Sequence, residues 1–93
     1  MQLAEVHQVS TASLSKQFGK AIRHHRTTAG LSQEKLAEKA GLHPTYVSML
    51  ECGVRNPTLD VAARIAKALK ISLPRLVEEA QSQRGFGKGR KSP

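Results

Sequence analysis

Hydrophobic side chains recur at helical spacing along this chain. Leu14, Phe18 and Ile22 stand four residues apart, and that interval places side chains on one face of an α-helix. Gly30 then supplies a left-handed stop. Ser32 and Gly41 bracket a second apolar run, which we expect to form a helix of about two turns that begins at a serine cap and ends at the glycine.

A third helix is expected almost directly after the second. Pro44 is tolerated in a first helical turn, and Val47, Met49 and Leu50 continue the apolar pattern as far as Gly53. Two short helices joined by a tight turn that contains glycine are typical of a helix-turn-helix unit. The pattern therefore favours that unit over a strand-helix-strand unit.

Two more helices follow, and no stretch alternates as a strand does. Thr58 is placed to cap a helix in which Leu59 and Leu69 share one face, and Ser72 is placed to cap a fifth helix with Pro74 in its first turn. We therefore expect an all-α fold, a compact domain of five helices. The expected boundaries are a flexible arm over residues 1–13, a folded domain over 14–80 and a disordered basic tail over 81–93.

Charge changes the picture by pointing to a partner. The 93 residues carry 15 Lys and Arg against 7 Asp and Glu, a net charge of +8. A positive field of this size favours a polyanion, and nucleic acid is the leading candidate. Composition alone leaves open the alternative that the charge serves solubility. The tail adds four cations without an acid, at Arg84, Lys88, Arg90 and Lys91.

Other chemistries find little support in the chain. Cys52 is the single cysteine, so we expect no internal disulfide and a cytoplasmic location. His24 and His25 are adjacent and would diverge by about 100° around a helix, so we expect no metal site and no cofactor. No catalytic triad, carboxylate pair, membrane span or signal peptide is recognisable. We therefore expect neither an enzyme nor a membrane protein.

The segment from Leu31 to Leu69 reads LSQEKLAEKAGLHPTYVSMLECGVRNPTLDVAARIAKAL. It resembles the Xre-type, lambda-repressor-like helix-turn-helix family in its Ser-Gln opening, its Gly-Leu turn and its Val-Ser-x-Leu-Glu third helix. The stretch from His43 to Glu51 is also similar to the controller proteins of restriction-modification systems, although Pro44 stands where those proteins carry arginine. The resemblance implies a lambda-repressor-like DNA-binding domain of a transcriptional regulator, such as a repressor.

The resemblance also implies which residues meet double-stranded DNA. It places residues 44–51 in the major groove as the recognition helix, where their side chains reach base edges or flanking phosphates. Core packing is the alternative for Met49. The start of the second helix and the loop after the third are expected at the DNA backbone. The expected DNA-binding residues are Gln33, His43, Pro44, Thr45, Tyr46, Ser48, Met49, Arg55 and Asn56.

Two further sets of residues follow from the resemblance. It aligns Arg26 and Glu51 with a partly buried ion pair that joins the third helix to the first. It implies a homodimer on an operator of two half-sites, because one such domain reads only a few base pairs. A different class remains open: an antitoxin or co-regulator whose main partner is a protein bound through the termini. The expected dimer contact comprises Leu59, Leu73, Pro74, Arg75 and Leu76.

Overall fold

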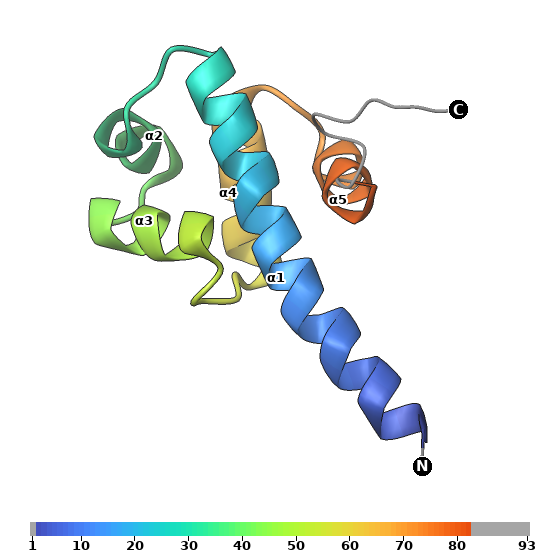
Figure 1. The fold of residues 1–93 in the computed structure, drawn as a ribbon. Coiled ribbons are helices and arrows are strands. Elements are labelled where there is room, and N and C mark those ends of the chain that lie inside the picture. The colour runs from blue at the N-terminus through green and yellow to red at the C-terminus, as the bar shows by residue number, and fades with distance from the viewer. Residues whose placement is uncertain (1, 83–93) are drawn as a thin grey trace.

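A computed structural model describes the backbone of residues 2–82 and the side chains of residues 14–82. In this part of the chain there are five helices and no strand, which confirms the all-α expectation (Figure 1). The helices are α1 Gln2–Thr28, α2 Gln33–Ala40, α3 Pro44–Cys52, α4 Leu59–Leu69 and α5 Leu73–Gln81.

The first helix begins earlier than the hydrophobic pattern suggested. α1 is helical from Gln2, twelve residues before Leu14, and the boundary expected after residue 13 stays a prediction. Neither glycine nor proline occurs before Gly19, so nothing in this stretch interrupts a helix once it has formed. The first turns of α1 extend beyond the other four helices (Figure 1). The expectation for the tail lies outside the described residues, apart from Gln81 and Ser82.

The remaining helices begin and end where the sequence marks caps. Ser32, Thr58 and Ser72 each accept a hydrogen bond from the backbone N–H three residues on, at 2.9, 3.1 and 3.3 Å. Gly41 and Gly53 close α2 and α3 in the left-handed conformation, with φ of 70° and 77°. Because Gly41 and Gly53 end the two helices, α2 and α3 stay short and are joined by a tight turn.

Each helix contributes at least one large, fully buried side chain to a single core. Ile22, Leu36, Leu50, Ile65 and Leu76 come from α1 to α5 in that order, and each is at most 1% exposed. Complete burial of such a side chain contributes about 1.5–3 kcal/mol to folding. Leu76 is enclosed within the protomer. The expected dimer contact can therefore use only the other four residues of its set, Leu59, Leu73, Pro74 and Arg75.

The helices α1 and α3 approach each other at backbone distance. A Cβ placed on Gly19 would overlap the carbonyl oxygen of Leu50 and would lie 2.8 Å from that of Glu51. Any larger residue at this position would therefore push the two helices apart. The absence of a side chain on α1 sets how closely α3 packs against it.

Candidate nucleic-acid interface

A shallow hollow lies where the first turn of α2 meets the first turn of α3. It has a volume of about 290 Å³. Four of its lining residues were expected at DNA from the sequence, and the fifth, Glu34, was not. The lining residues are Gln33, Glu34, Pro44, Thr45 and Ser48.

The helix α3 has one face turned into the core and one turned outward. Val47 and Leu50 are buried against the other helices. Thr45 is exposed, while Ser48 and Met49 are half-exposed and lie outside the buried core. The outward face can therefore offer a hydroxyl and methyl from Thr45, a hydroxyl from Ser48 and an apolar contact from Met49.

Tyr46 is less exposed than Thr45 beside it, and its contact with DNA stays a prediction. Its side chain is half-buried and packs against the hydrophobic core. Tyr46 follows Thr45 by one residue, a rotation of about 100° around the helix, and that rotation turns it from the outward face toward the core. Part of its bulk therefore supports α3 in place.

His43 is the N-cap of α3 and fixes its first turn. Its Nδ1 accepts a hydrogen bond from the backbone N–H of Thr45 at 3.2 Å, and Pro44 follows in the first turn, where a missing N–H has no cost. His43 itself is exposed. The start of α3 is thus set by His43 and Pro44, two residues that the sequence assigned to DNA contact.

The ion pair implied for Arg26 and Glu51 is present and nearly buried. Arg26 Nε donates to Glu51 Oε2 at 2.6 Å and Arg26 Nη2 donates to Oε1 at 3.1 Å, with side chains 11% and 3% exposed. Arg26 Nη1 also donates to the Leu31 carbonyl oxygen at 2.8 Å. This two-pronged geometry is the strong form of such a pair. It links α1, the loop after it and α3.

Gln33 joins the same network. Its Nε2 donates to Glu51 Oε1 at 3.0 Å, a contact that the sequence did not indicate. The start of α2 is therefore tied to α3 through one carboxylate. This contact holds the free N–H groups of the first turn of α2 next to the outward face of α3, and such groups favour an anion.

The loop between α3 and α4 contains the two residues expected at the DNA backbone. Arg55 is exposed. The side-chain oxygen of Asn56 accepts a hydrogen bond from the hydroxyl of Ser15 on α1. Asn56 therefore anchors the loop to α1, and Arg55 extends from a loop whose position is fixed.

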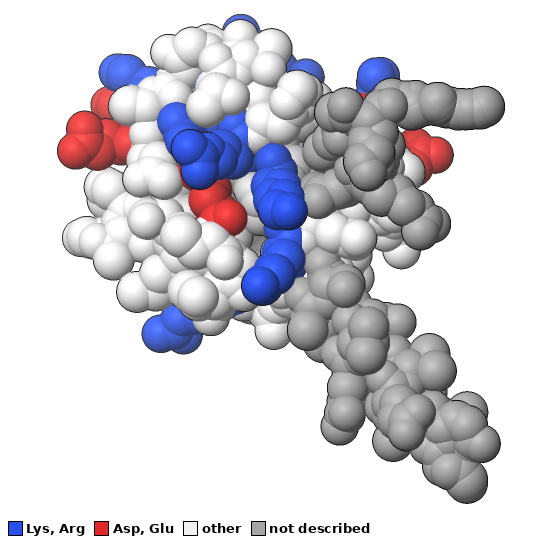
Figure 2. Space-filling view, in the orientation of Figure 1, with Lys and Arg blue, Asp and Glu red and all other residues white. Residues whose placement is uncertain are grey.

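A row of cations on α1 was missed by the sequence reasoning. Lys16, Lys20 and Arg23 are exposed and recur at intervals of four and three residues, which places them on one face of the helix. Figure 2 shows Lys and Arg side chains in a row over α1, on the side toward α3. Their spacing was the available signal, but it reads as the solvated face of an amphipathic helix.

The described residues show neither a metal-binding cluster nor a membrane-spanning helix. No three of their His, Cys, Asp and Glu side chains gather where a metal ion could be held. None of their helices is long and apolar enough to cross a membrane. In the expected dimer contact, Leu59 is 81% exposed, Leu73 is half-buried, and Pro74 and Arg75 are exposed.

Comparison with known proteins gives consistent matches. The family model described as Helix-turn-helix matches residues 22–76. An HTH-type transcriptional regulator of Mycobacterium tuberculosis is 46% identical over 54 residues, 58% of this chain and 39% of that protein. The Control protein C.SmaI of Serratia marcescens is 46% identical over 56 residues, 60% of this chain and 67% of that protein.

A solved structure matches as well. The restriction-modification controller protein C.AhdI from Aeromonas hydrophila is 43% identical, with a TM-score of 0.64 over 66% of this chain and 92% of that one. The chain thus spans nearly all of C.AhdI but only 39% of the mycobacterial regulator.

Proposed function

The chain belongs to the helix-turn-helix family, and on that premise we propose that it binds double-stranded DNA and regulates transcription. The observation that carries the proposal is the hollow between α2 and α3, where Thr45 and Ser48 are accessible while the opposite face of α3 is held in the core. The major groove of B-DNA, about 12 Å wide, admits one such helix.

Backbone contacts would position the protein on DNA. The first turn of α2 presents free N–H groups beside Gln33, Arg55 extends from the anchored loop, and the row of Lys16, Lys20 and Arg23 borders α3. Each of these groups favours a phosphate without reading sequence. Glu34, in the same hollow, would oppose a phosphate, so it limits how closely the backbone approaches α2.

Base contacts would come from the outward face of α3. The Thr45 methyl suits the methyl group of thymine, its hydroxyl and that of Ser48 can donate or accept, and Met49 offers only apolar contact. None of these side chains makes the bidentate contact to guanine that arginine makes. The specificity would therefore rest on thymine methyl groups and on DNA shape.

Two copies would read two half-sites. Leu59 is strongly exposed beside an apolar hollow of about 380 Å³ that also includes Leu14, Phe18, Pro57 and Val77. An apolar surface of this kind suits self-association. In a two-fold dimer the half-sites would be centred about 10 base pairs apart, or a multiple of that.

The test is selection of bound duplexes from a random library, followed by affinity measurements. We expect enrichment of one sequence made of two related half-sites. Thr45→Ala should relax the preference at one base pair of each half-site. Arg55→Gln, a matched change outside α3, should weaken binding to every sequence alike and lower the salt slope by about one. A library that yields no enriched sequence would overturn the proposal.

Control of restriction-modification genes is the second candidate. C.SmaI and C.AhdI are described as a control protein and a restriction-modification controller, and both exceed 40% identity. Sequencing the genes beside this one separates the candidates. A methyltransferase and a nuclease there, with the selected operator at their promoter, would establish this role, and their absence would exclude it.

A further inference from the structure

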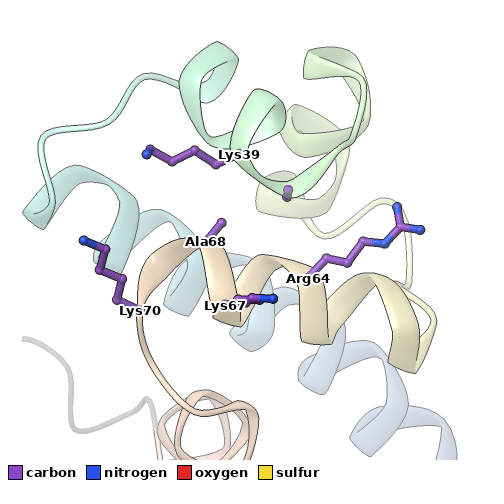
Figure 3. Close-up of a pocket in the computed structure, with 6 residues that line it drawn as sticks. Lys39, Arg64, Lys67, Ala68 and Lys70 are labelled. Atoms are coloured by element: carbon purple, nitrogen blue, oxygen red, sulfur yellow. The ribbon is translucent and has the colours of Figure 1, made fainter.

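A second basic surface lies between α2 and α4. It is a hollow of about 450 Å³, larger than the one at α3, and the two share no residue. Lys39 of this hollow and Glu34 of the other are five residues apart, or about 140° around α2, so the hollows lie on different flanks of that helix. The second is lined by Lys39, Ala40, Arg64, Lys67, Ala68 and Lys70 (Figure 3).

Four cations line this hollow and no acid does. Lys39, Lys67 and Lys70 are exposed. Arg64 meets Asp60 at 3.4 Å, but both side chains are at least half exposed, and such pairs leave most of the cation's field to the solvent. In Figure 3, Lys39 extends from α2, Arg64 and Lys67 extend from α4, and Lys70 extends from the residue that caps the end of α4. Two helices therefore contribute to one positive surface.

Lys70 occupies a backbone position that suits glycine. Its φ is 62°, and it is the non-glycine residue with positive φ among the described residues. The Lys70 N–H closes α4 on the carbonyl oxygens of Ala66 and Lys67. A β-carbon is unfavourable there, so the side chain is present despite a local cost. A positive charge at a helix C-terminus offsets part of that cost, and the test below separates this structural role from binding.

The residues that line the hollow between α2 and α4 indicate what kind of partner it binds. Its only apolar residues are Ala40 and Ala68, and its one arginine, Arg64, is half exposed and paired with Asp60. The anchors of protein interfaces are instead tryptophan, tyrosine or arginine side chains packed into pockets that exclude water. No aromatic residue lines it, so it lacks the stacking platforms that single-stranded nucleic acids use. Cations alone are sufficient for the backbone of a duplex. We propose that this surface binds the phosphate backbone of a second DNA duplex, so that one protomer holds two duplex segments.

The proposal goes beyond the recognition function because it uses a different surface. The test is the number of duplexes bound per protomer, measured by sedimentation velocity at low salt with excess duplex. A duplex of about 10 base pairs, one helical turn, is a nearly straight rod, because DNA bends only over about 150 base pairs, so one such duplex cannot wrap around α2 to occupy both flanks. We expect two duplexes per protomer for the native chain. Dimerisation cannot mimic this result, because recognition faces alone provide one duplex site per protomer.

Four variants give the matched comparison. Lys39→Gln, Lys67→Gln and Lys70→Gln combined should bind one duplex per protomer, and the same three positions changed to Arg should again bind two. Thr45→Glu with Ser48→Glu should lose the first duplex and keep the second, so failure of the recognition proposal is distinguishable from failure of this one. Lys70→Gly should raise the melting temperature and weaken the second duplex several-fold.

The contrary results are equally definite. One duplex per protomer for the native chain, or two for the triple glutamine variant, would overturn the proposal. If the glutamine changes lowered the melting temperature but left two duplexes bound per protomer, these cations would only stabilise helix ends. Poly-glutamate peptide and free duplex can be compared as competitors at equal concentrations of negative charge. If the peptide displaced the second duplex more effectively, the surface would be assigned to an acidic protein.

Discussion

The helix α1 holds α3 on one side and α5 on the other by contacts of different kinds. Toward α3, Gly19 allows backbone contact and the Arg26–Glu51 pair is nearly buried. Toward α5, His25 Nε2 donates to Glu79 Oε1 at 2.5 Å, and both side chains are about a quarter exposed.

This difference shows which part of the protein has a fixed orientation. A buried pair in which all three guanidinium nitrogens donate hydrogen bonds resists displacement, because separating it strands charges away from water. A pair that water reaches costs little to open. We therefore expect the position of α3 to be rigid and the polar attachment of α5 to respond to solution conditions.

The largest effect should come from Arg26→Ala. Glu51 would keep a nearly buried charge with only Gln33 to donate to it, and the free energy of unfolding should fall by about 3–5 kcal/mol. Urea denaturation measures this loss. Arg26→Met combined with Glu51→Leu should be less damaging than the sum of the single changes, because it strands no charge. Additive losses would show that the two side chains do not stabilise each other.

Gly19→Ala should follow in size. Its methyl group would overlap the Leu50 carbonyl oxygen, and overpacking of this kind costs about 1–3 kcal/mol. Because the strain is relieved by moving α3, operator affinity should fall even in the fully folded protein. Thr27→Ala, at an exposed position of α1, is the control and should change neither the free energy of unfolding nor the operator affinity. Normal operator affinity for Gly19→Ala would mean that α3 tolerates displacement.

The attachment of α5 should depend on pH. The hydrogen bond from His25, reinforced by Arg75 and opposed by burial, holds the pKa of the Glu79 carboxyl below its usual value of 4.5. A carboxyl with a lowered folded pKa stabilises the fold above its unfolded pKa and loses this contribution as pH falls through the folded value. Glu79→Gln should therefore cost about 0–1 kcal/mol at neutral pH. The difference between variant and native chain should vanish in denaturation measured well below pH 4.5, and a constant difference would contradict this account.

The smallest effect is expected for Arg75→Ala. Arg75 Nε donates to Glu79 Oε2 at 3.1 Å, but its side chain is 68% exposed. Its loss should cost about 0.3–0.5 kcal/mol, visible as a slight decrease in melting temperature that disappears at high salt. A loss as large as that of Arg26→Ala would erase the contrast between the two sides of α1.

Much of this fold was predictable because its signals are local. Ser32, Gly41 and Gly53 mark helix ends through contacts within a few residues, so the short helices fell where the pattern placed them. Gly19 carried no such signal, since its importance comes from a carbonyl group on another helix. Nor could the sequence pair His25 with Glu79, which stand 54 residues apart.

The candidate site divides in the same way. Thr45 and Ser48 follow from helical periodicity and are accessible in the structure. The packing of Tyr46 against the core did not follow, because whether an amphipathic side chain packs inward depends on the neighbouring helices. The basic surface between α2 and α4 was beyond reach for the same reason: Lys39 and Lys67 are distant in sequence and become neighbours only when the helices pack.

The glycine contact between α1 and α3 has a consequence for protein engineering. The residues that anchor α3 and those on its outward face are different side chains, so Thr45, Ser48 and Met49 do not hold the helix in place. A library that randomises these three positions while keeping Gly19, Arg26 and Glu51 should yield folded proteins with new DNA preferences. The scaffold would remain constant while its specificity is rewritten.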